Sequence, residues 1–284
     1  MNNCCYDGIP AVATRVSFDA PDFLKYDETN YDVFQTVVHC RTVTVAIARN
    51  FGSNSYNDHI ILKNHIFETW NTFWEEFGGF PFKYYTIVIG YNLPYDAEKT
   101  GRGEMGEGFE TSYDPYLTNY QYYSHGMYHA WNGNAFRQYQ EKRWFMEGVT
   151  EYYGFRQSRN TFYTQGLNYA YQRYIETYNA GRDVPLCSIN DQGNPDWLHY
   201  WKGALVAYML DRELATDGHH IGEVARIVYQ RYGVTSQGTP TDSEFLSILS
   251  EVSGKDFTDF YNNYICGTAP LPLDGVHFDW IPHD

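Results

Sequence analysis

The hydrophobic pattern of this 284-residue chain changes from a strand-like to a helix-like period, and this change restricts the fold most. Residues 32–50 (DVFQTVVHCRTVTVAIARN) are rich in β-branched side chains with partial alternation, which predicts strands. From Ile61 to Phe77 the apolar and aromatic residues recur at helical spacing, which predicts a helix ending at Gly78 and Gly79. Residues 84–90 (YYTIVIG) are typical of a buried strand.

The second half of the chain has a helical pattern almost throughout. Segment 91–108, rich in glycine and glutamate, predicts a loop, and the proline-containing tail from Gly267 predicts an extended chain. We therefore expect an α+β fold, with a small sheet at the front and a mostly helical second half. The predicted helices after Thr118 cover about 118–133, 142–158, 161–180, 197–216, 220–232, 242–252 and 256–264.

Composition and charge exclude several classes of partner. A hydrophobic content of 43% can fill a sizeable core, so disorder is not expected. The 35 acidic residues outnumber the 20 basic ones, and a net charge of −15 repels phosphate backbones and anionic lipid. No apolar run is long enough to span a membrane, and the first residues lack the features of a signal peptide. We expect a soluble protein that binds neither nucleic acid nor membrane, while its compartment and oligomeric state stay open.

The five cysteines do not define a compartment or a metal site. They form no CxxC pair, and their odd number leaves at least one without an internal partner. A few buried or incidental thiols are favoured over a disulfide framework.

Two histidines have a spacing that suits a metal ion. His125 and His129 are four residues apart, so on a helix they project from the same face one turn apart. One zinc ion requires this spacing of two ligands on a single helix. The chain has 10 histidines, however, and a chance pair at the surface or in the core is a common alternative.

Two further predicted helices carry side chains that complete a possible metal site. Glu147 supplies a carboxylate, and a set of two histidines and one glutamate leaves a fourth zinc position open. Glu151, on the same helix face, can accept a hydrogen bond from a ligand histidine. The alternative for both is a solvated acidic face. Tyr200 begins another helix and can donate to an oxyanion, or simply pack in the core.

Five motifs follow one another along the chain. They are FGGFPF at 77–82, HxxxHAWN at 125–132, EG-T-YY at 147–153, YxKGALVAYMLD at 200–211 and DFxxFYNNYIxGTAPLPL at 256–273. Together they resemble the glycyl aminopeptidase family of the gluzincin zinc metallopeptidases, which are relatives of thermolysin and of the larger zinc aminopeptidases. The motifs occur in the order found in that family, over roughly residues 55 to 273.

The resemblance implies a thermolysin-like catalytic domain that binds Zn2+ and a peptide or small amine-bearing substrate. By position, it assigns the zinc ligands, a tyrosine that steadies the tetrahedral intermediate, a carboxylate that orients a ligand, and a glutamate that holds the free amino terminus of the substrate. It also implies a short β-rich amino-terminal region at 1–54, a metallopeptidase domain at 55–266 and an extended tail at 267–284. The zinc ligands are His125, His129 and Glu147, and the tyrosine is Tyr200. The carboxylate that orients a ligand is Glu151, and the glutamate that holds the amino terminus of the substrate is Glu110.

The chain departs from the family pattern at Gly126, since it has HGMYH where the family has HExxH. The family glutamate takes a proton from zinc-bound water and passes one to the leaving amine. Its loss costs about 10²–10⁴ in rate, or roughly 3 to 5 kcal/mol of barrier. One interpretation is a weak or inactive peptidase that binds peptides. Another is an active zinc-dependent hydrolase or other Lewis-acid enzyme whose base is Glu104, Glu107, Glu110 or a tyrosine. The third interpretation is that an engineered change removed the glutamate at position 126.

Overall fold

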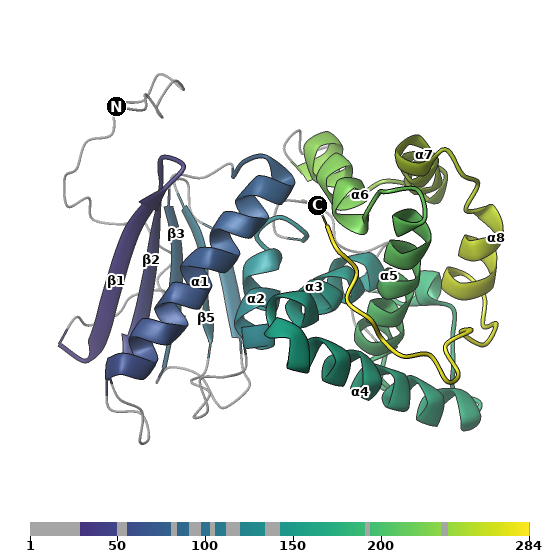
Figure 1. Ribbon diagram of the computed structural model, residues 1–284, viewed down its shortest axis with the longest axis horizontal. Coiled ribbons are helices and arrows are strands. Elements are labelled where there is room, and N and C mark those ends of the chain that lie inside the picture. Colours follow the sequence, from purple (N-terminus) through teal and green to yellow (C-terminus); the bar gives the residue numbers. More distant parts are fainter. Residues whose placement is uncertain are drawn as a thin grey trace. The chain divides into compact units, whose positions relative to one another are not determined.

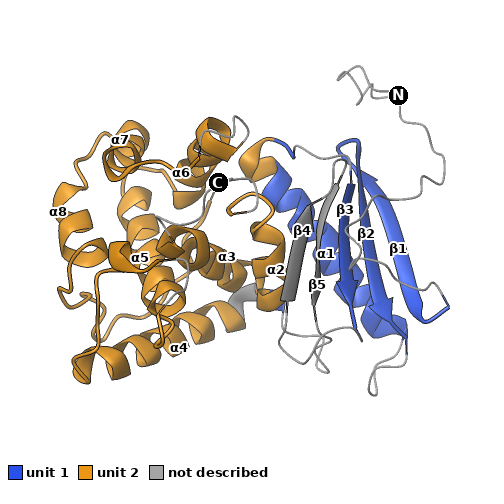
Figure 2. Ribbon diagram, turned by 180° about the vertical axis from the view of Figure 1, so that it is seen from behind, with its two compact units in different colours: residues 1–74, 79–120 blue, residues 75–78, 121–284 orange. Residues whose placement is uncertain are grey.

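The computed structural model describes most of the chain, which forms two compact units (Figure 2). One unit comprises residues 1–74 and 79–120, and the other comprises 75–78 and 121–284. The domain boundaries expected from the sequence, between residues 54 and 55 and between residues 266 and 267, stay a prediction. The described residues are 29–49, 56–80, 84–90, 98–102, 106–111, 120–133, 143–190, 194–233 and 238–283, with backbone alone for 98–102, 106–111 and 159–161.

The first unit contains a five-stranded sheet in the order β1-β2-β3-β5-β4, of which Figure 1 labels β1, β2, β3 and β5. The outer pairs β1–β2 and β4–β5 are antiparallel, and the inner pairs β2–β3 and β3–β5 are parallel. The buried face of α1 packs on the sheet through Trp70, whose ring lies 4.6 Å from that of Tyr85. The elements are β1 (Tyr31–Val38), β2 (Arg41–Ala48), α1 (Tyr56–Phe77), β3 (Tyr84–Ile89), β4 (Glu98–Arg102) and β5 (Gly106–Thr111).

The predicted strands at 32–50 and 84–90 and the helix ending at Phe77 are confirmed. The loop predicted at 91–108 is wrong in part, because β4 and the start of β5 lie within it. Strand β4 has the sequence EKTGR, which contains no apolar side chain and so gives no alternating pattern. Among the described strands it lies at the edge of the sheet and pairs with β5 alone.

The regular elements described in the second unit are helices (Figure 1). They agree with the predicted spans, except that α2 is shorter than predicted and that three spans contain π-helical turns, η2, η4 and η5. The helix-rich α+β class is thereby confirmed, and the tail after Gly267 contains no helix or strand up to residue 283. The elements are α2 (Tyr120–Tyr128), η2 (Trp144–Val149), α3 (Thr150–Gln157), α4 (Arg159–Asn179), η3 (Leu186–Ser188), α5 (Leu198–Ala215), α6 (Ile221–Val228), η4 (Tyr229–Gly233), α7 (Asp242–Ser253), α8 (Thr258–Phe260) and η5 (Tyr261–Ile265).

Helix α5 lies in the core of this unit, and the tail is fastened to it. Asp211 of α5 is fully buried and accepts hydrogen bonds from the Tyr152 hydroxyl at 2.5 Å and from the Ile221 backbone N–H at 2.8 Å. The His283 ring lies 2.8 Å from the same carboxylate, and Arg156 donates to the Ile281 carbonyl. A buried carboxylate needs such partners, so these contacts fix the end of the tail.

Cys187 and Cys266 form a disulfide that joins η3 to the end of η5. The expectation that the cysteines are incidental thiols is therefore wrong for this pair. Their separation of 79 residues left no local spacing signal, because disulfide partners meet through the fold rather than through sequence proximity.

None of the helices in the described part of the chain is both long enough and apolar enough to cross a membrane.

Candidate metal centre

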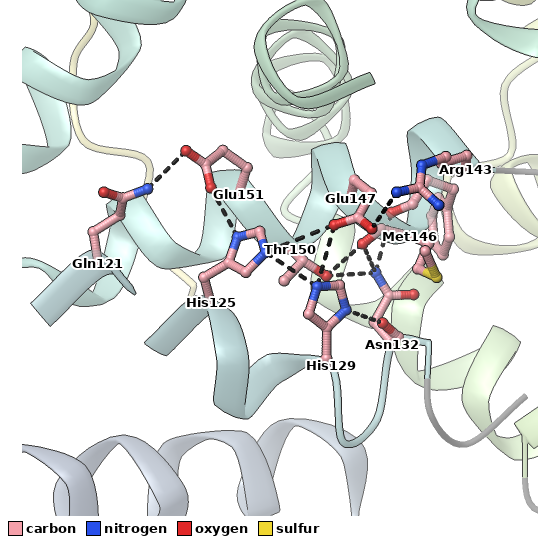
Figure 3. Close-up of polar contacts among 10 residues, drawn as sticks. Gln121, His125, His129, Asn132, Arg143, Met146, Glu147, Thr150 and Glu151 are labelled. Carbon is pink, nitrogen blue, oxygen red and sulfur yellow. Dashed lines mark hydrogen bonds and ion pairs between the residues drawn. The ribbon is translucent and has the colours of Figure 1, made fainter. Parts of the chain in front are cut away.

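His125 lies in the buried last turn of α2, and His129 directly follows the end of that helix. The backbone N–H of His129 donates to the His125 carbonyl, so the rings are one turn apart on one face. Their Nε2 atoms are 3.0 Å apart (Figure 3). The predicted geometry of the pair is thus present.

Glu147 of η2 brings a carboxylate to the same point. Its Oε2 atom lies 3.2 Å from His129 Nε2 and 3.7 Å from His125 Nε2, and all three side chains are buried. In tetrahedral coordination, zinc ligands at about 2.0–2.2 Å from the ion lie roughly 3.3 Å from each other. The observed separations of 3.0, 3.2 and 3.7 Å bracket that value, so the three atoms fit a zinc ion.

The outer nitrogen of each histidine has a partner that orients the ring. His125 Nδ1 lies 2.8 Å from Glu151, which also accepts a hydrogen bond from Gln121, and His129 Nδ1 lies 3.1 Å from the Asn132 carbonyl (Figure 3). When each Nδ1–H donates to its oxygen, the Nε2 lone pair is turned toward Glu147. Histidine ligands of metals usually have such partners.

The carboxylates of Glu147 and Glu151 favour positive charge at the triad. Burial alone lowers the pKa of His125, but contacts with Glu147 and Glu151 outweigh burial and raise that pKa to about 10. Burial raises the pKa of Glu147, yet His129 and His125 hold it well below its usual value. The Arg143 guanidinium is also near, 3.6 Å from Glu147 Oε1. The carboxylate is therefore ionised, as a metal ligand must be.

Tyr200, in the first turn of α5, lies beside the triad. Its ring stacks on His125 with centroids 5.9 Å apart and planes 22° apart. Burial and the adjacent Glu147 carboxylate both raise the pKa of the Tyr200 hydroxyl. The hydroxyl is consequently protonated at neutral pH and acts as a hydrogen-bond donor.

Asn132 is a supporting residue that the sequence interpretation did not identify. Its Nδ2 donates to the carbonyls of Phe145 and Met146, at 3.1 and 3.2 Å, and to Thr150 Oγ1 at 3.2 Å. These carbonyls belong to η2, whose π-helical turn carries Glu147. Asn132 therefore connects the segment after His129 to the turn that positions the carboxylate. In the sequence, the feature that could have indicated this role is the position of Asn132 three residues after His129.

The remaining predicted residues give less information. Gly126 is buried in α2 and has no side chain beside His125. Glu107 and Glu110 belong to β5, of which only the backbone is described. Glu104 lies outside the described residues.

No protein-family model matches the chain, and no curated protein matches it in sequence. Solved structures do match. An aminopeptidase N family protein from Idiomarina loihiensis superposes with a TM-score of 0.68 at 17% identity, over 86% of this chain and 48% of that one. The M1 zinc metallopeptidase from Deinococcus radiodurans gives 0.56 at 12%, over 86% and 53%. A mutant of it bound to a Tyr-Ser-Ala substrate gives 0.56 at 14%, over the same shares.

The fold is that of the M1 zinc metallopeptidases. This chain spans about half the length of the M1 structures that it matches. At these identities the likeness concerns the fold, and what the M1-like fold does in this chain depends on its own residues.

Proposed function

We propose that the chain is an aminopeptidase-type zinc metallopeptidase domain that keeps the metal ligands and lacks the general-base glutamate. It binds peptides and cleaves them weakly or not at all. The observation that supports this most is the convergence of His125, His129 and Glu147 within an M1-like fold.

The residues of the site have separate roles in this proposal. His125, His129 and Glu147 hold Zn2+, which when bound polarises a substrate carbonyl as a Lewis acid. Glu151 and the Asn132 carbonyl orient the two histidine rings. The Tyr200 hydroxyl donates a hydrogen bond to the oxygen on which negative charge develops.

The missing step is proton transfer. Gly126 cannot take a proton from water or give one to the leaving amine. Tyr200 is a poor replacement, since its raised pKa keeps the hydroxyl protonated and gives it no tendency to act as a base. Turnover is accordingly about 10²–10⁴ lower than with a glutamate at position 126.

The finer assignments follow from the sequence resemblance and belong to the same proposal. The domain is of the thermolysin-like gluzincin type and resembles the glycyl aminopeptidases, with the domain at 55–266. Its substrate is a peptide or a small amine-bearing molecule, whose free amino terminus is held by Glu110. One neighbouring structure is described as bound to a Tyr-Ser-Ala substrate, which supports a peptide ligand.

An active zinc-dependent hydrolase or other Lewis-acid enzyme with a relocated base is the second candidate. It is favoured by the retention of all three ligands together with Tyr200, whose raised pKa makes it a donor rather than the base. The remaining candidates for the base are Glu104, Glu107, Glu110 and a tyrosine other than Tyr200.

Metal analysis tests the zinc site itself. Protein purified without chelator and supplied with zinc should contain about one ion per chain by elemental analysis, and His129→Ala should contain none. His277→Ala is the matched control, because His277 is an exposed histidine paired with Asp279. Zinc content that is unchanged in His129→Ala, or absent from the unmodified protein, would refute the metal site.

A further inference from the structure

Trp197 has a backbone conformation that is rare for a large side chain. Among the described residues, the non-glycine residues with positive φ are His39, Cys40 and Trp197. The first two form the two-residue turn of the β1–β2 hairpin, where positive φ is common. Trp197 directly precedes α5 with φ 56° and ψ 31°, in the left-handed region that favours glycine and asparagine. Strain of this kind collects at functional sites.

Specific contacts hold Trp197 in this conformation. Its backbone N–H donates to the Asn194 carbonyl at 2.9 Å, and the Asp196 N–H donates to Asn194 Oδ1 at 2.9 Å. Arg182 holds the Asp196 carboxylate through Nε and Nη2, each at 3.0 Å. The turn before α5 is therefore built to present this residue.

The indole of Trp197 contacts two aromatic rings and is otherwise largely exposed. It stacks on His199 with ring centroids 6.0 Å apart and planes 20° apart. His199 is 2% exposed, and burial lowers its pKa to about 4, so the supporting ring is neutral. Trp197 itself is 56% exposed, although its backbone is fixed. The backbone strain, rather than the exposure alone, makes this indole a candidate for contact with a ligand.

The Tyr200 ring connects the indole to the metal triad. Its centroid is 5.6 Å from that of Tyr200, and the Tyr200 ring stacks on the ligand His125 at 5.9 Å. A peptide whose carbonyl oxygen points at the triad and at Tyr200 carries a side chain next to that carbonyl. Because Tyr200 contacts both His125 and Trp197, the exposed indole is the nearby aromatic surface available to such a side chain.

We propose that Trp197 is a specificity-determining residue that binds an aromatic side chain adjacent to the substrate carbonyl held at the metal triad. The inference rests on the proposed function. Offset or edge-to-face ring contacts suit the exposed indole. A cationic substrate side chain is expected to bind less well. The neighbouring carboxylate, Asp196, already accepts hydrogen bonds from Nε and Nη2 of Arg182.

Dipeptide binding to the zinc-loaded full chain tests the subsite. Isothermal titration calorimetry with Phe-Ala, Ala-Phe and Ala-Ala should show that one aromatic dipeptide binds about tenfold more tightly than Ala-Ala. Trp197→Gly should remove this preference and leave the affinity for Ala-Ala unchanged. Phe162→Ala removes another exposed aromatic side chain, on α4, and should keep the preference.

Thermal unfolding separates a binding role from a structural one. Glycine accepts the left-handed conformation, so Trp197→Gly should melt at the same temperature as the unmodified protein or higher. A lower melting temperature together with weaker binding of all three dipeptides would show that Trp197 is structural. Trp197→Asn, which also tolerates this conformation, provides an independent check of the binding result.

Two outcomes distinguish failure of the subsite from failure of the function. If Ala-Ala binds but no aromatic dipeptide binds more tightly, or if Trp197→Gly keeps the preference, the subsite is wrong and the proposed function stands. If the zinc-loaded protein binds none of the dipeptides, the proposed function is wrong and the subsite fails with it.

Discussion

Gly148 of η2 and Gly203 of α5 touch backbone to backbone: a Cβ atom on Gly148 would lie 2.5 Å from the Gly203 Cα. Glu147 and Tyr200 lie on these two elements, close to the crossing point. The absence of two side chains therefore lets the carboxylate and the tyrosine approach the same site.

Gly203→Ala should separate the two elements. The added methyl group would lie 2.8 Å from the Gly148 Cα and 3.2 Å from the Trp144 carbonyl oxygen, so the backbone must shift. We expect a loss of about 1–3 kcal/mol in the free energy of unfolding, measured by urea denaturation, together with weaker zinc binding. Gly218→Ala is the control for backbone strain alone, because Gly218 has φ +80° and open space around it. It should leave zinc binding unchanged. Equal zinc affinities for Gly203→Ala and the unmodified protein would contradict the role of this crossing.

Asn132→Ala should weaken zinc binding without removing a ligand. The substitution deletes the three hydrogen bonds from Nδ2 to Phe145, Met146 and Thr150. Residues that orient metal ligands typically contribute about 10–100-fold in affinity, and we expect a loss in this range in a chelator competition assay. Asn168→Ala is the matched control, since the exposed Asn168 donates only to the Thr164 carbonyl within α4. Similar affinities for the two variants would count against the role of Asn132.

Reduction of the Cys187–Cys266 disulfide should destabilise the protein. The bridge closes a loop across 79 residues, for which the loss of chain entropy in the unfolded state predicts about 4 kcal/mol. We expect a lower midpoint of urea unfolding in the presence of reductant. The double variant Cys187→Ser and Cys266→Ser should have this lower midpoint with or without reductant. A midpoint that reductant does not change would contradict the pairing.

Glu76 should make stability depend on pH in a defined direction. Burial raises its pKa from 4.5 to about 7, although Tyr153 and Arg156 oppose the shift. The folded protein thus binds a proton that the unfolded chain releases between pH 4.5 and 7. This contribution to stability is present below pH 4.5 and is lost as the pH rises to 7, with a slope of at most about 1.4 kcal/mol per unit.

Glu76→Gln removes this dependence, and unfolding curves at several pH values measure the effect. The difference in free energy of unfolding between the variant and the unmodified protein should grow in favour of the variant from pH 5 to about 7. A difference for Glu76→Gln that does not change with pH would show that the carboxyl group titrates normally in the folded protein.

Much of the fold could be predicted from the sequence, because apolar side chains at helical or strand spacing reflect which face is buried. Helices α4, α5 and α7 and strand β3 are of this kind. Strand β4 could not be predicted, since its pairing with β5 involves the backbone. The π-helical turns were also hidden, because their apolar pattern differs little from that of an α-helix over a few residues.

The convergence of His125, His129 and Glu147 could be predicted because the two histidines are four residues apart and because the neighbouring motif supplies the glutamate. Contacts that depend on the tertiary structure could not be predicted from the sequence. The disulfide joins distant cysteines, and the hydrogen bonds from Asn132 to η2 depend on carbonyls that a π-helical turn presents. Trp197 belongs to no sequence motif. Its strained backbone conformation is visible only in the structure.

The central claim is that the site binds zinc but lacks a base, and the direct test is the turnover of amino-acyl anilides by Gly126→Glu. Gly126→Gln provides a side chain of similar size without a basic group. We predict that kcat/KM rises by about 10²–10⁴ in zinc-loaded Gly126→Glu and does not rise in Gly126→Gln. Zinc-dependent turnover by the unmodified protein that equals or exceeds that of Gly126→Glu would contradict the account.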